Sequence, residues 1–97
     1  MKVVIVEEEV EFTLVELSRV CRADTATLAT LVDEGVLTPI GNSPQTWLFD
    51  GGALRRARLA LRLTHDLELN TAATALVLNL IDEIAALKTR LRRLGRD

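Results

Sequence analysis

The sequence predicts a mainly α-helical fold, in which a helix-turn-helix and a small β wing precede a third helix and a long C-terminal helix. Two predicted helices with apolar residues at helical spacing are joined by about three residues, which is typical of a helix-turn-helix: the first ends near Arg22 and the second is capped by Asp24 or Thr25. The turn-rich segment 41–45 separates two stretches of extended character, as expected for a wing. Beyond residue 70, apolar residues recur at alternating spacings of three and four, which indicates a long helix with a heptad pattern.

The composition suits one folded domain. The chain has 97 residues, of which 48% are hydrophobic and 27% charged, unlike a disordered protein. A chain of this size buries roughly 60–65% of its unfolded surface, so it needs no disulfide or metal to fold. We expect a single domain, 1–97, in which 1–50 hold a short strand, the helix-turn-helix and the wing, 51–69 the third helix and a turn, and 70–97 the long amphipathic helix.

An N-capping pattern predicts where the first helix begins. Thr13 followed three residues later by Glu16 is a capping-box pattern, and the helix that it opens should end near Arg22. The β-branched run 3–6 before it predicts a short strand, which we expect to pair with the segment around 47–49. The first helix should bury Leu14, Leu17, Val20 and Cys21.

The second helix has signals at both ends. Asp24 or Thr25 is the expected N-cap, and Gly35 supplies the left-handed residue that ends the helix. Its apolar face is formed by Leu28, Leu31 and Val32. In the following extended segment, Trp47 and Phe49 alternate with Leu48 and therefore share one face, where they either pack in the core or anchor a partner.

The third helix, predicted over 52–65 after Asp50, has arginines on one face. Arg55, Arg58 and Arg62 recur at helical spacing, so they either contact phosphate or pair with acidic residues of the N-terminal half. Asn70 is the expected N-cap of the last helix, which should run to about Leu94.

The apolar row of the last helix has two interpretations, since it either packs back on the domain or pairs with the same helix of a second chain. Its N-terminal end should be covered with the help of Leu67, Leu69, Ala72, Ala73, Ala75 and Leu76. Beyond Ile84 the row is longer than three short helices can cover, which favours a homodimer. The predicted dimerisation residues are Val77, Leu80, Ile84, Leu87, Leu91 and Leu94.

Nothing in the sequence indicates catalysis. The chain has one His, one Cys and no Gly-rich phosphate loop, so we expect no enzyme activity, no metal and no cofactor. A single Cys21 forms no internal disulfide and suits a reducing compartment. The N-terminal apolar run is too short for a signal peptide, and no later run approaches the roughly 18 residues of a membrane span. We therefore expect a cytoplasmic protein that does not contact membranes.

Charge is divided unevenly along the chain. Residues 1–50 carry nine acidic and three basic side chains, a net −6, whereas residues 51–97 carry nine basic and five acidic ones, a net +4. No Lys or Arg occurs from Ala23 to Leu54, the region of the helix-turn-helix and wing. A DNA-binding surface needs cations there to contact phosphates and guanine, so the sequence favours a basic protein partner instead.

The order of elements resembles the winged DNA-binding head of MerR-type regulators. More specifically, three segments of this sequence resemble the CbpM family of bacterial chaperone modulators: Trp47–Asp50, Arg62–Asn70 and Ala75–Leu87. The resemblance spans nearly the whole chain, although 47–87 carries its specific part.

This resemblance implies binding to the J-domain of a CbpA- or DnaJ-like co-chaperone, restraint of the Hsp70 ATPase that the co-chaperone stimulates, and a bacterial cytoplasmic location. An acidic face would complement the basic helix of a J-domain. The predicted partner-binding residues are Glu8, Glu9, Glu11, Asp24, Asp33 and Glu34.

Two other functions remain as alternatives to this hypothesis. A MerR-like DNA-binding regulator would use the Arg55 face and the C-terminal bases to contact phosphate, with an affinity that falls steeply with salt. A bare dimerisation or scaffold module would bind neither DNA nor a J-domain.

Overall fold

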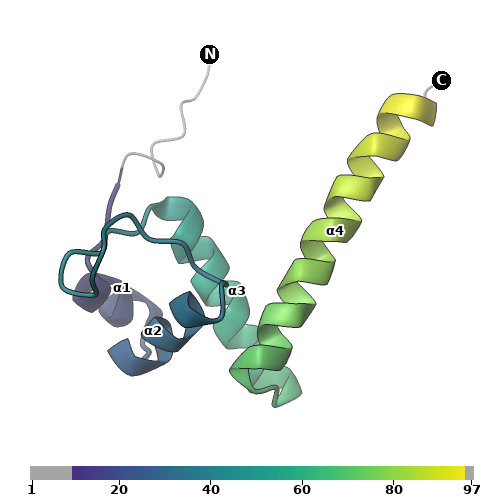
Figure 1. Ribbon diagram of the computed structural model, residues 1–97. Helices are drawn as coiled ribbons and strands as arrows, with labels where there is room; N and C mark the ends of the chain where they lie inside the picture. The colour runs from purple at the N-terminus through teal and green to yellow at the C-terminus, as the bar shows by residue number, and fades with distance from the viewer. Residues whose placement is uncertain (1–9, 96–97) are drawn as a thin grey trace.

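The computed structural model describes residues 10–95, in which four helices form (Figure 1). Helices α1 (Leu14–Cys21) and α2 (Thr25–Asp33) pack with α3 (Gly51–Leu67) to form a head, and α4 (Thr71–Gly95) projects from it. The chain bends by 119° between α3 and α4. The predicted mainly helical fold, with a helix-turn-helix, a third helix and a long last helix, is therefore confirmed.

Local hydrogen bonds explain where α1 and α2 begin and end. Thr13 Oγ1 accepts a hydrogen bond from the backbone N–H of Glu16 at 3.1 Å, and Glu16 Oε1 accepts one from Thr13 N–H at 2.9 Å. This reciprocal pair confirms the capping box. Asp24 is the N-cap of α2 but makes no side-chain capping bond. Gly35, with φ of 81°, follows the C-cap of α2 in the left-handed conformation that was expected of it.

The caps of the two longer helices lie where the sequence indicated. Asp50 Oδ1 accepts a hydrogen bond from Ala53 N–H at 2.8 Å, and Asn70 Oδ1 accepts one from Ala73 N–H at 2.8 Å. Helix α3 begins one residue earlier than predicted and ends two residues later. Glu68, at φ of 55°, forms its C-cap, so only a short connection remains before α4.

The predicted β wing is wrong, because no strand forms within residues 10–95. Two isolated antiparallel bridges occur instead, Phe12 with Phe49 and Ile40 with Leu48. Longer pairing is prevented because Pro39 and Pro44 have no N–H to donate, and the turn from Ser43 to Thr46 occupies the loop. The predicted strand at 3–6 lies outside the described residues. Within the segment that we expected to pair with it, Phe49 forms its bridge with Phe12.

The core lies where α1, α2, α3 and the start of α4 meet. Its fully buried side chains include Leu17, Leu28, Leu31, Leu37, Phe49 and Leu78. The ring of Trp47 meets that of Phe49 edge to face, with centroids 6.0 Å apart, so the two aromatic side chains do share one face. The expected burial of Val20 is wrong, since 40% of it is exposed. Around the axis of α1, Val20 lies on one side of the buried Leu17, whereas Leu14 and Cys21 lie on its other side. The core packs against the side that holds Leu14 and Cys21.

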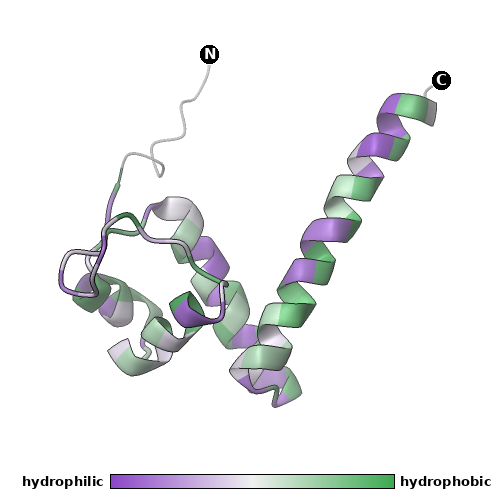
Figure 2. Cartoon of the chain, viewed as in Figure 1, coloured by the Kyte–Doolittle hydropathy of each residue, from purple (hydrophilic) through white to green (hydrophobic). Residues whose placement is uncertain are grey.

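Helix α4 contacts the head only through its first turns. Thr74, Ala75 and Leu78 are its buried residues. Hydrophobic residues recur along the rest of the helix, as the colouring of Figure 2 shows, and the large ones from Leu80 to Leu94 are exposed. The radius of gyration is 15.2 Å, against about 13 Å for a compact chain of about 100 residues, which reflects this projection. Within residues 10–95 no single helix is long and apolar enough to cross a membrane, and only α3 and α4 taken together pass that test of length and composition.

We predict that Phe49→Ala lowers the free energy of unfolding by about 3–5 kcal/mol, because it removes a fully buried ring from the centre of the head. Ile40→Ala in the same loop is the matched control, since 64% of Ile40 is exposed, and should change stability by less than about 0.5 kcal/mol. Urea unfolding followed by circular dichroism measures both. Equal effects of the two substitutions would contradict this assignment of the core.

Candidate functional site

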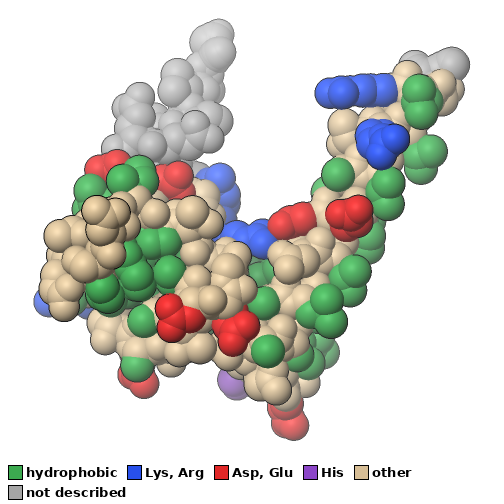
Figure 3. Space-filling model, viewed as in Figure 1, with side chains coloured by type: hydrophobic (Ala, Val, Ile, Leu, Met, Phe, Trp, Pro, Cys, Tyr) green, Lys and Arg blue, Asp and Glu red, His purple; other side chains and the backbone are tan. Residues whose placement is uncertain are grey.

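The outer face of α4 is an exposed apolar surface. The α4 seam, as we call the six predicted dimerisation residues, consists of Val77, Leu80, Ile84, Leu87, Leu91 and Leu94. Five of them are 47–78% exposed, and Val77 is half-buried. Figure 3 shows hydrophobic side chains along the edge of α4 that faces away from the head.

The seam and the buried face of α4 lie on opposite sides of the helix. Leu78 is buried against the head, whereas Leu80, two residues later and thus about 200° around the helix, is exposed. Leu67 and Leu76, which were expected to cover the head, are 58% and 59% exposed. The expectation is wrong for these two leucines and for the exposed Ala72, whereas Ala75 is buried as expected, together with Thr74 and Leu78.

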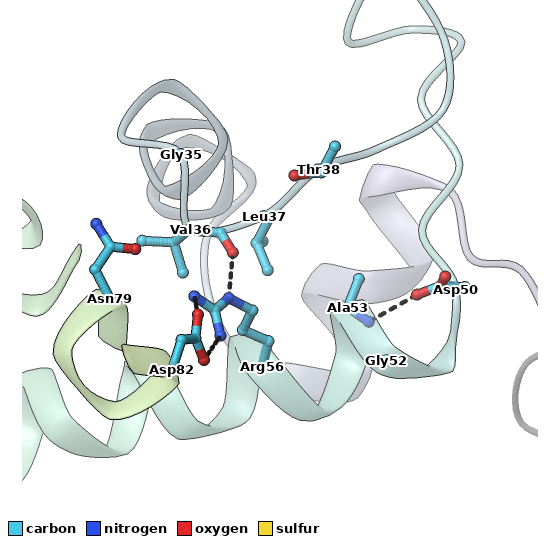
Figure 4. A pocket seen from close by; sticks show the side chains of 10 residues that line it. All are labelled: Gly35, Val36, Leu37, Thr38, Asp50, Gly52, Ala53, Arg56, Asn79 and Asp82. Atoms are coloured by element: carbon cyan, nitrogen blue, oxygen red, sulfur yellow. Dashed lines mark hydrogen bonds and ion pairs between the residues drawn. The ribbon is translucent and has the colours of Figure 1, made fainter. Parts of the chain in front are cut away.

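A second feature braces α4 against the head. Arg56 of α3 donates from Nε to the backbone oxygen of Val36 at 2.7 Å, and from Nη1 and Nη2 to the carboxylate of Asp82 at 3.3 and 3.0 Å (Figure 4). The hydroxyls of Thr64 and Thr74, 2.9 Å apart, make a further polar contact between α3 and α4. The fork of one guanidinium thus links the segment after α2 to both long helices.

Around this brace lies an open cleft of about 390 Å³, lined by the 35–38 segment, the start of α3 and one side of α4. Its two carboxylates are already used, because Asp50 caps α3 and Asp82 receives the Arg56 fork (Figure 4). Among residues 10–95, no group of three His, Cys, Asp or Glu side chains is placed to hold a metal ion. Both carboxylates of the cleft therefore make structural contacts, one at the start of α3 and one between α3 and α4.

The predicted partner-binding carboxylates that the structure describes are exposed but not gathered at one point. Glu8 and Glu9 lie outside the described residues, whereas Glu11, Asp24, Asp33 and Glu34 are all exposed. Asp24 and Asp33 lie at opposite ends of α2, about 13 Å apart along its axis. Asp33 and Glu34 precede Gly35 in the wall of the cleft. Within residues 10–95, none of these four carboxylates forms an ion pair.

Cys21 is a free, half-buried thiol at the end of α1. Burial raises the pKa of this thiol above its usual value, and the nearby positive charge of Arg58 opposes the shift. A thiol with a raised pKa holds its proton at neutral pH, which fits a packing role and not a nucleophilic one.

Sequence reasoning missed the Arg56–Asp82 brace. Arg56 lies between Arg55 and Arg58, whose spacing drew attention to a different face of α3, and Asp82 follows 26 residues later. No local pattern connects residues at that separation, so only the fold reveals their pairing.

The fold and these surfaces define a class of protein. A family model described as MerR HTH family regulatory protein matches residues 12–96, and the chain belongs to this helix-turn-helix class. It is 34% identical over 96 residues to chaperone modulatory protein CbpM of Coxiella burnetii (strain Dugway 5J108-111), an alignment that covers 99% of this chain and 91% of the relative. Chaperone modulatory protein CbpM of Pseudomonas putida (strain W619) is 39% identical over 70 residues, 68% of this chain and 69% of the relative. Within the MerR class, the chain belongs to the CbpM family.

We predict that the two ends of the brace differ in their effect on stability. Arg56→Met should lower the free energy of unfolding by about 2 kcal/mol, because the buried Val36 carbonyl loses its charged donor. Asp82→Asn should cost less than about 1 kcal/mol, because its side chain is 58% exposed and the amide oxygen still accepts from Arg56. Denaturant titrations of the two variants test this order, and a larger loss for Asp82→Asn would contradict it.

Proposed function

We propose that this chain binds the J-domain of a DnaJ-like co-chaperone and so limits the stimulation of an Hsp70 ATPase. The relatives named above are chaperone modulatory proteins, which supports a role in modulating a chaperone. The observation that carries the proposal furthest is the set of exposed carboxylates on the head, which form no ion pair within residues 10–95, together with the lack of any Lys or Arg from Ala23 to Leu54.

The mechanism that we propose is competition for one face of the J-domain. J-domains resemble one another in presenting a basic helix beside a His-Pro-Asp loop, and that basic face is needed for contact with Hsp70. Exposed carboxylates attract such a basic face over distances of about 10 Å. They also disfavour the binding of negatively charged proteins. A J-domain held in this way is unable to contact Hsp70 with the same surface.

The contact is centred, in this proposal, on Asp33 and Glu34. These two residues are adjacent, exposed, and at the end of α2 beside the cleft. The exposed carboxylates of Asp24, at the other end of α2, and of Glu11 contribute further negative charge. Glu8 and Glu9, which lie outside the described residues, complete the set of residues that we propose for the contact. The proposal implies the bacterial cytoplasm as the compartment in which the protein acts.

The charges of α2, the second helix of the helix-turn-helix, argue against DNA binding. A helix-turn-helix reads DNA by placing its second helix in the major groove, where Arg or Lys contacts guanine and phosphate. Helix α2 has no Lys or Arg along Thr25–Asp33, and it ends in Asp33 and Glu34. These carboxylates would repel the phosphate backbone.

We predict that Asp33→Lys/Glu34→Lys weakens binding to an isolated J-domain about tenfold at low salt, because two attractive charges become repulsive. The matched control is Asp66→Lys/Glu68→Lys, which changes net charge equally but at the C-terminal end of α3. Isothermal titration at two salt concentrations measures both variants. Equal affinity of parent and Asp33→Lys/Glu34→Lys would show that the contact is elsewhere.

The same titration with random duplex DNA separates the other functions. Our proposal requires J-domain binding and no binding to DNA. Affinity for duplex that falls steeply with salt, without J-domain binding, would support a DNA-binding regulator instead. Binding to neither would leave a dimerisation module.

A further inference from the structure

We propose that one face of α3 binds an acidic linear segment of another protein, which inserts an apolar side chain beside the guanidinium groups of this face. The arginine face, as we call it, consists of Arg55, Arg58 and Arg62 together with an apolar hollow next to them. None of these residues takes part in the proposed J-domain contact, and the inference is independent of that contact.

The arginine face and the brace lie on opposite sides of α3. Arg56 donates to the segment after α2 and to α4, whereas Arg58 and Arg62, two and six residues later, lie about 200° and 240° around the helix. All three arginines of the face are exposed. A partner can therefore approach this side of the head while Arg56 keeps its contacts with α4.

The positive charge of the face is available to a partner. Within residues 10–95, neither Arg58 nor Arg62 forms an ion pair. Arg58 lies close enough to the thiol of Cys21 to oppose the rise in its pKa, which places this guanidinium beside the end of α1. Arg22 follows Cys21 and is exposed, so it adds a further positive charge at that end of α1.

An apolar hollow of about 130 Å³ opens beside two of the guanidinium groups. It is lined by Val10, Phe12, Gly51, Leu54, Arg55 and Arg58. Small-molecule sites have volumes of roughly 300–1,000 Å³, so this hollow suits one aliphatic side chain of a larger partner. Glu11 lies between Val10 and Phe12, and in an extended segment its side chain points to the opposite side. The hollow therefore has apolar walls and a positive rim.

An acidic peptide with one apolar residue matches both properties. Arginine pairs with a carboxylate through two parallel hydrogen bonds, and clusters of arginines recognise acidic motifs. Arg55 and Arg62 are about 10 Å apart along the axis of α3, which is about the length of four residues of extended chain. Carboxylates on both sides of an apolar residue can therefore reach the arginines while the apolar side chain fills the hollow.

A nucleic acid matches only the charges. Its phosphates could pair with the arginines, but its backbone presents polar and charged groups, so the walls of the hollow would have no apolar partner. The exposed carboxylates of Asp24 and Asp33 on the same head would also repel the phosphates. The chemistry of the arginine face thus favours an acidic protein segment.

The first test measures binding of a fluorescein-labelled peptide with the central sequence Glu-Glu-Leu-Glu-Glu to the full-length protein, by fluorescence anisotropy at about 0.15 M salt. We expect a Kd below about 1 mM. Replacing the leucine of the peptide by serine should weaken binding about tenfold, because the hollow loses its apolar occupant. No binding at about 1 mM protein, or equal affinities of the leucine and serine peptides, would overturn the proposal.

The second test locates the peptide on the protein. Arg58→Glu/Arg62→Glu should weaken binding of the leucine peptide at least about tenfold, because two attractive charges become repulsive. The matched control is Arg90→Glu/Arg93→Glu, which reverses two exposed charges of α4 and should change the affinity less than about twofold. Circular dichroism verifies that both variants fold. Equal effects of the two variants would overturn the proposal, since the peptide would then respond to net charge alone.

Two competition measurements distinguish other occupants of the arginine face. Random duplex DNA that displaces the labelled peptide at a lower concentration than the unlabelled peptide does would assign the face to phosphate. Glu7, Glu8 and Glu9 lie outside the described residues and directly precede Val10. If Glu7→Gln/Glu8→Gln/Glu9→Gln bound the peptide more than about tenfold tighter than the parent, the face would belong to the chain's own acidic stretch. We expect neither result, and either one would overturn the assignment to another protein.

Discussion

The position of α4 depends on the guanidinium of Arg56. Only the first turns of α4 are buried against the head, so the packing contact that holds this 25-residue helix is short. Arg56 adds three hydrogen bonds, one to Val36 and two to Asp82, and Asp82 lies one turn beyond the last buried residue, Leu78. A planar fork fixes both the distance and the direction of its partner, which a single point charge does not. The 119° bend between α3 and α4 is maintained by this brace together with the contact of Thr64 and Thr74.

This geometry separates two surfaces that differ in chemistry. The head presents exposed carboxylates, at Asp33 and Glu34 among others, whereas the far side of α4 presents the apolar seam. The buried residues of α4 and the seam residues are two positions apart in sequence and therefore lie on opposite sides of the helix. When one side packs against the head, the other faces outward.

Much of the fold could be predicted from the sequence, because its signals are local. The capping box at Thr13 and Glu16, the left-handed Gly35 and the caps Asp50 and Asn70 each act within a few residues, and the structure confirms them. The prediction of a β wing was wrong because the length of strand pairing depends on how the loop closes. Alternation of apolar residues does not reveal how a loop closes. The burial of Val20 failed because the side of α1 that meets the core depends on where α2 and α3 pack.

The candidate surfaces were predictable to different degrees. The seam was visible as a heptad pattern, since spacing along one helix fixes which residues share a face. Its outward direction was not, because that depends on which residues of α4 contact α3. The acidic character of the head followed from composition, but the separation of Asp24 from Asp33 by the length of α2 did not. The Arg56–Asp82 brace joins residues 26 positions apart, and no periodicity connects them.

The central claim is that this chain restrains a co-chaperone through its J-domain. The most direct measurement is the steady-state ATPase rate of Hsp70, stimulated by a DnaJ-like co-chaperone, as the chain is added. The account predicts that the stimulated rate falls towards the basal rate of Hsp70 alone, and that excess isolated J-domain with its His-Pro-Asp loop inactivated relieves this inhibition. A stimulated rate that stays constant at concentrations where the chain is bound to the J-domain would contradict the claim.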